Sequence, residues 1–97
     1  MNDKSKEDQY LGSFFNYLVI EKGLSSNSIK AYKIDIKKFV LWLSRSKKPS
    51  FKNICESDLN EYIAYMFKNK LSSSSVNRNI SSIKAFYLFL IKRKIIM

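Results

Sequence analysis

The sequence contains no histidine and only one cysteine. A single thiol cannot form an internal disulfide, and without histidine the chain offers neither a zinc-finger ligand set nor a histidine-based catalytic triad. No apolar run approaches the roughly 18 residues that a membrane span requires, and no signal-peptide pattern opens the chain. We therefore expect no metal, no cofactor, no catalytic residue and no membrane segment in it.

What is present is an ordinary globular composition on a short chain. Hydrophobic residues make up 45% of the 97 residues and charged residues 27%, which is too apolar for a disordered segment. This length allows one domain. We expect residues 1–97 to form a single soluble, cytoplasmic domain.

Positive charge exceeds negative charge by ten, and it is concentrated in two segments. Residues 25–55 hold eight cations and one acid, a net charge of +7, and residues 70–97 hold six cations and no acid. Residues 1–24 and 56–69 are net −1 and −2. A generally basic surface would not separate the charge in this way, so the pattern favours a binding face for a polyanion such as nucleic acid, with an acidic membrane surface as the weaker alternative.

Helical periodicity and capping signals predict an all-α fold with no strands. Cys55 and Asp58 have the spacing of a capping box, and Gly23 and Pro49 are expected to end helices. The expected N-caps are Ser5, Ser25 and Ser72. The expected helices cover residues 6–22, 26–46, 56–69 and 73–94.

Two segments of the chain repeat each other. Residues 24–43 read LSSNSIKAYKIDIKKFVLWL and residues 71–90 read LSSSSVNRNISSIKAFYLFL, with nine of twenty positions identical at an offset of 47 residues. Two copies are too few for a solenoid. The repeat indicates two equivalent helices, each preceded by another helix, and hence two helical hairpins with pseudo-two-fold character.

Helical wheels assign a core face to the second and the fourth expected helix. We expect Tyr32, Phe39, Ile83, Phe86 and Leu90 to be largely buried rather than available to stack on bases. Trp42 lies off this face and is expected to pack under the following loop or on the first helix. Further apolar residues at helical spacing are Leu11, Phe14, Phe15, Leu18, Val19, Leu59, Tyr62, Ile63, Met66, Phe67, Val76, Ile80, Tyr87 and Ile91.

Beside the core face, each basic helix carries a polar stripe behind a serine-rich N-terminus. The stripes are Lys30, Lys33 and Lys37 on the second helix and Asn77, Ser81 and Lys84 on the fourth. Helix N-terminal amides and serine hydroxyls bind phosphates, and two such ends side by side could enter a major groove about 12 Å wide. The serines could also be caps and linker only. The candidate DNA-binding residues are Ser25, Asn27, Ser28, Lys30, Lys33, Lys37, Ser72, Ser74, Ser75, Asn77, Arg78, Ser81 and Lys84.

The same two segments resemble a known family. Residues 23–36, GLSSNSIKAYKIDI, and the later Phe39, Trp42 and Leu43 are similar to the GLS-x-x-T-x-x-x-Y-x-x-D-L…F-x-x-[FW]-L pattern of the N-terminal core-binding domain of tyrosine recombinases, of the phage-integrase and Xer type. Residues 71–90 are similar to its second signature, LS-x-x-[ST]-[IV]-x-R-x-L-S-x-[LI]-[RK]-x-FY-x-[FY]-L. The sequence departs from these patterns at Ser28 in place of threonine, Cys55 in place of the usual serine or threonine cap, Ile80 in place of leucine, and Lys84 in place of the common arginine. Lysine at this last position keeps the charge but cannot make the bidentate contact of arginine.

This resemblance implies a four-helix SAM-like domain whose second and fourth helices face the major groove of duplex DNA. It also implies a separate catalytic domain with arginine, lysine, histidine and tyrosine residues, so that this chain, which looks like an excised piece, would be the non-catalytic DNA-gripping half of a bacterial or phage recombinase. Other recombinase subunits would be partners in the synaptic assembly, and the isolated domain is expected to be monomeric. The alternative is a helical protein-interaction module that self-associates without binding DNA.

Overall fold

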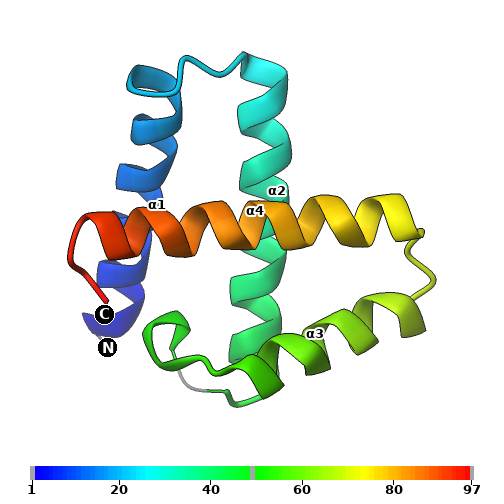
Figure 1. The fold of residues 1–97 in the computed structure, drawn as a ribbon. Coiled ribbons are helices and arrows are strands. Elements are labelled where there is room, and N and C mark those ends of the chain that lie inside the picture. Colours follow the sequence, from blue (N-terminus) through cyan, green and yellow to red (C-terminus); the bar gives the residue numbers. More distant parts are fainter. Residues whose placement is uncertain (1, 49, 97) are drawn as a thin grey trace. The chain divides into compact units, whose positions relative to one another are not determined.

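The computed structural model describes the backbone of residues 2–48 and 50–96 and the side chains from Gln9 onward, apart from Pro49 and Met97. The described residues form helices and no strand, which confirms the all-α fold (Figure 1). The α-helices are α1 (Asn2–Ile20), α2 (Ser26–Arg45), α3 (Glu56–Lys68) and α4 (Ser73–Lys92), and a short 3-10 helix, η1 (Phe51–Asn53), precedes α3.

The predicted helix boundaries are close, with the largest error at the start of the chain. Helix α1 begins at Asn2 and not at residue 6, so Ser5 lies within the helix and is not its N-cap; the Ser5 side chain lies outside the described residues. Helix α2 ends at Arg45 and α4 at Lys92, one and two residues earlier than expected. Pro49, which was expected to stop the second helix, lies outside the described residues.

The ends of three helices show how a chain with two glycines terminates its helices. Lys47, Lys70 and Lys94 each adopt a positive φ, of 55°, 66° and 59°. The amide of the following residue then donates to a carbonyl five residues back, as Leu71 does to Met66 at 3.1 Å. This is the Schellman arrangement, which glycine usually supplies because an L side chain is strained there.

The chain divides into two compact units, residues 1–33 and residues 34–97, with the boundary inside α2. In the first unit α1 packs on the start of α2. Phe14 is fully buried, and its ring meets the Tyr32 ring edge-on at a centroid distance of 6.1 Å. Tyr32 itself is half-buried and less enclosed than expected.

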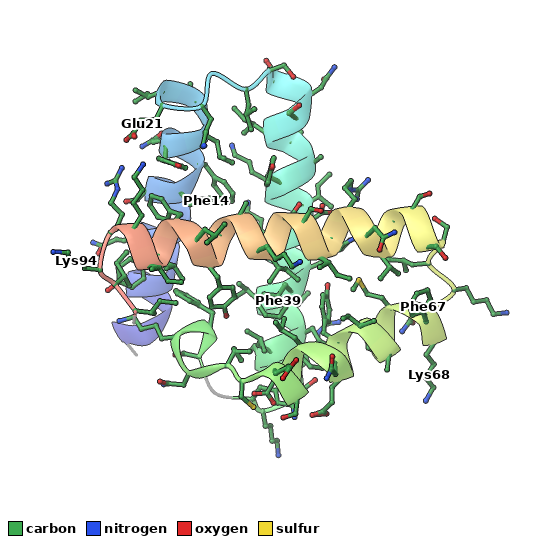
Figure 2. The ribbon with its side chains drawn as sticks, viewed as in Figure 1. Phe14, Glu21, Phe39, Phe67, Lys68 and Lys94 are labelled. Carbon is green, nitrogen blue, oxygen red and sulfur yellow. The ribbon has the colours of Figure 1, made fainter. Side chains whose placement is uncertain are left out.

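In the second unit, α3, α4 and the rest of α2 enclose an aromatic core. Phe39, Phe86 and Leu90 are fully buried and Ile83 is 3% exposed, as predicted. Phe51 of η1 is also fully buried, 5.2 Å from the Phe86 ring, and its carbonyl accepts a hydrogen bond from the Tyr87 hydroxyl. Figure 2 shows Phe39 inside this unit, whereas Phe67 and Lys68 lie at the far end of α3.

Several apolar residues are placed differently from the sequence prediction. Trp42 is buried and packs on α3, with its ring 5.0 Å from the Tyr62 ring and 6.1 Å from the Tyr65 ring, neighbours that the sequence analysis did not name. On α4 the buried arc includes Phe89, at 2% exposure, because this arc is centred near Asn79 and Phe86 and extends further toward Ser82 than expected. The expected core residues that are instead about half exposed are Val19, Phe67 and Ile91.

Candidate nucleic-acid interface

The two basic helices begin with the same serine cap. In α2 the Ser28 amide donates to the Ser25 hydroxyl at 3.2 Å, and in α4 the Ser75 amide donates to the Ser72 hydroxyl at 3.2 Å. Neither helix has an acidic residue in its first turn. Acidic residues there normally compensate the positive end of the helix dipole. In α2 and α4 no acidic side chain of the first turn does so, and an external anion would be attracted to these N-termini.

Most of the candidate residues are exposed on these two helices. Asn27, Lys30 and Lys33 lie in the first unit, and there the Lys33 ammonium group sits 5.5 Å from the centre of the Phe15 ring. The candidates of α4 are exposed except for Ser75, which is half-buried. The structure thus leaves these side chains accessible, and their contact with DNA stays a prediction.

A two-pronged ion pair in the second unit joins α2 to α4. The Asp35 carboxylate accepts hydrogen bonds from Arg78 Nε at 3.1 Å and Arg78 Nη2 at 2.7 Å, and from the Ser82 hydroxyl at 2.8 Å. The Asp35 side chain is 0% exposed and the Arg78 side chain 54%. The hydrogen bonds and negative charge of Asp35 raise the pKa of Arg78 above its already high value, so this guanidinium stays charged.

Sequence reasoning included Arg78 but missed Asp35 and Ser82. A signal was present in the sequence, since Asp35 is the single acidic residue of the segment 25–55, which also holds eight cations. Ser82 also follows Asp35 by 47 residues, the offset of the internal repeat. When a two-fold axis relates two helices that cross, equivalent residues meet at that axis. The Asp35–Ser82 contact is what the predicted pseudo-two-fold relation of the two repeated segments would produce.

The crossing also sets the directions of the neighbouring lysines. Successive helix residues are turned by about 100°, so a side chain two positions after a contact residue points about 160° away from it. Lys37 stands two residues after Asp35, so it points to the side of α2 that faces away from α4. Lys84 stands two residues after Ser82, so it points to the side of α4 that faces away from α2. Arg78, one turn before Ser82, stays beside the crossing. That Lys37, Arg78 and Lys84 share one DNA-facing surface stays a prediction.

The loop before α3 holds a separate charged cluster. The Cys55 amide donates to Asp58 at 3.1 Å, which confirms the expected cap and lowers the pKa of Asp58. Lys48 lies 3.3 Å from Asp58 and also pairs with Glu61, whose hydrogen bond raises the pKa of Lys48. Lys48 therefore has acidic partners within the protein, which makes it a poor candidate for DNA contact.

A cavity of about 400 Å³ opens in the second unit between α2, α3 and α4. Trp42, Tyr65 and Leu41 contribute its apolar wall, and Lys38 and Arg45 line it as well. The described residues contain neither a cluster of side chains fit to hold a metal ion nor a helix long and apolar enough to cross a membrane.

Comparison with known proteins agrees with this architecture. The family model of the phage integrase N-terminal SAM-like domain matches residues 11–94. The chain is 39% identical over 83 residues to the tyrosine recombinase XerD of Rickettsia prowazekii, with 86% of this chain and 26% of that protein covered. It is 35% identical over 86 residues to XerC of Anoxybacillus flavithermus, covering 89% and 29%, and 28% identical over 92 residues to XerC of Halalkalibacterium halodurans, covering 95% and 30%.

The chain therefore spans less than a third of the length of each of these relatives. No solved structure matches it significantly. Both repeated segments, with the serine caps and the Asp35–Arg78 pair, lie inside the matched range. The chain thus belongs to the family of phage integrase N-terminal SAM-like domains.

Proposed function

We propose that residues 1–97 are the DNA-binding module of a tyrosine recombinase and grip duplex DNA through α2 and α4. One observation carries this proposal. The two segments of net charge +7 and +6 contain the two helices that begin with a serine cap and no acidic residue. The positive side chains and the helix N-termini, which lack a compensating acidic residue, would both bind phosphate groups of the DNA backbone.

The named relatives are tyrosine recombinases, so we extend the proposal to the whole protein of which this chain would form part. Its strand-exchange chemistry would belong to other residues, because this sequence has no histidine for the catalytic constellation that the family resemblance implies. Duplex DNA and further recombinase subunits would be its partners. The module alone should form no covalent adduct with DNA, which a denaturing gel after incubation with duplex would test.

The proposal is tested by titrating a duplex at several salt concentrations. Contact with about five phosphates predicts that log K falls with log salt at a slope of about −4 to −5. A single small module buries only about 600–1,000 Å² of its surface, so binding should be weak and nearly independent of sequence. Absence of binding at low salt would contradict the proposal.

Lysine variants locate the interface. Lys37→Ala and Lys84→Ala should each reduce the magnitude of the slope by about 1 if these side chains contact phosphate. The matched control is Lys68→Ala, which removes another exposed lysine, at the end of α3 in the net acidic segment. Equal loss of slope in all three variants would mean that attraction is diffuse and that α2 and α4 have no special part.

A second candidate function is self-association, and the cavity favours it. Leu41 and Tyr65 at this cavity are 48% and 44% exposed, and exposed apolar rims are common at protein interfaces. Sedimentation of the DNA-free chain at two salt concentrations separates the functions. Salt-insensitive dimers without DNA binding would replace the DNA proposal with this one.

A further inference from the structure

We propose that Asp35 is a positioning residue that holds Arg78 in a fixed orientation for contact with a DNA phosphate, an inference that rests on the proposed function. Asp35 itself would touch no DNA, since its side chain is 0% exposed. Its part would be to order the arginine before DNA arrives.

The first support is the geometry of the arginine fork. Asp35 binds the edge of the guanidinium formed by Nε and Nη2, at 3.1 and 2.7 Å. A guanidinium is planar and carries five N–H donors. The adjoining edge, formed by Nη1 and the second Nη2 hydrogen, points away from the carboxylate and has the parallel donors that bind phosphate in a bidentate manner.

The second support is the unequal exposure of the two ions. The carboxylate is wholly enclosed and receives a third hydrogen bond from Ser82, at 2.8 Å, while about half of the Arg78 side chain remains in solvent. Burying a carboxylate is costly, and apolar residues often replace a buried ion pair without loss of stability. Stability alone therefore explains this arrangement poorly. Holding a charged, half-exposed guanidinium in one orientation would explain the buried carboxylate, its three hydrogen bonds and the exposure of Arg78 together.

The third support is conformational entropy. A free arginine side chain samples many rotamers, and much of this freedom is lost when the side chain is ordered on binding. Two hydrogen bonds to a buried, immobile acceptor on another helix remove this freedom in the unbound protein. The lysines of the candidate set have no such anchor among the described contacts, so Arg78 is the candidate best prepared for a defined phosphate contact.

The repeat shows that this device occurs in one copy only. The position equivalent to Arg78 in the first segment is Ala31, and the position equivalent to Asp35 in the second is Ser82. The two repeated segments thus supply complementary parts, an acceptor from one and donors from the other. The result is a single arginine held where the helices cross.

The decisive experiment measures the sign of the effect of Asp35→Asn on affinity for a random duplex. Removing an acid raises the net charge of +10 by one unit, so diffuse electrostatics alone would tighten binding. Positioning predicts the opposite, a loss of about three- to tenfold, as for binding that must newly order one side chain. The matched control is Glu56→Gln, which removes an exposed acid from α3 and should leave binding unchanged or slightly tighter.

A second variant keeps the test valid if Asp35→Asn does not fold, as circular dichroism would reveal. Arg78→Lys keeps the charge and loses the fork, and it should also weaken binding at least threefold. In an Arg78→Gln background, Asp35→Asn should cause no further loss, because Asp35 acts through Arg78 alone.

Three results would overturn the inference. The first is a folded Asp35→Asn protein that binds DNA as tightly as the unchanged protein or more tightly. The second is full affinity in Arg78→Lys. The third is an unchanged protein that binds no DNA at all, which would remove the proposed function as well, whereas either of the first two would leave that function standing.

Discussion

At the scale of single residues, burial separates two phenylalanines, one before α3 and one near its end. Phe51 of η1 is fully buried, whereas Phe67, near the end of α3, is 50% exposed. Phe51 contacts the Phe86 ring and its carbonyl is bound by Tyr87. The connection between α2 and α3 is therefore part of the core and not a passive linker.

This difference predicts unequal costs for the same substitution. Phe51→Ala should destabilise the protein by about 3–5 kcal/mol, because it empties a fully enclosed site. Phe67→Ala deletes the same atoms from a half-exposed site and should cost less than about 1 kcal/mol. Urea denaturation followed by circular dichroism measures both, and equal costs would show that Phe51 is not a core residue.

A second residue-scale prediction concerns alkaline pH. Burial raises the pKa of Tyr62 from 10.0 to about 12, with added effects of Tyr65 and Asp35. The unfolded chain loses this proton first, so the contribution of Tyr62 to stability is complete below about pH 10 and is lost as the pH rises towards 12. Tyr62→Phe should flatten the decline of unfolding free energy over this range, and an unchanged decline would contradict the assignment.

At the scale of elements, the caps determine where the helices begin and end. Serine caps at the starts of α2 and α4 satisfy amides that lack helical partners. At their ends, α2, α3 and α4 turn through a lysine of positive φ. A non-glycine residue in that conformation is strained, so a substitution that removes the strain should stabilise the folded state.

Replacing one of these lysines by glycine should therefore stabilise the fold. Lys70 has a φ of 66° and is exposed, so Lys70→Gly should raise the unfolding free energy by about 0.5–1 kcal/mol. The matched control is Lys70→Ala, which removes the same charge and keeps the strain. Chemical denaturation of both variants should show a gain for glycine only, and a gain for alanine would point to charge instead.

At the scale of the whole molecule, the dominant property is the excess of ten positive charges. Such an excess repels itself in the folded chain and attracts polyanions. Raising the salt from about 0.01 M to about 0.15 M shortens the Debye length from about 30 to about 8 Å. The two consequences of the charge should therefore respond to salt in opposite directions.

This gives a thermal prediction. Without DNA, the melting temperature should rise as salt is added, because self-repulsion is screened. With excess duplex, the additional stabilisation at low salt should shrink as salt is added, because phosphate contacts weaken. Differential scanning fluorimetry with and without duplex measures both trends, and a DNA-induced shift that is independent of salt would contradict electrostatic binding.

By itself the sequence determined the helices, the serine caps and most of the core, because capping and helical periodicity act over about four residues. It also supplied the two basic segments, whose residues remain candidates for DNA contact. Only the tertiary structure decided that Phe89 is buried while Ile91 is exposed, since this depends on which side of α4 the other elements cover. Likewise the contact of Asp35 with Arg78 joins residues 43 apart, and no local rule reaches across that distance, because it is the crossing of α2 and α4 that brings the carboxylate and the guanidinium together.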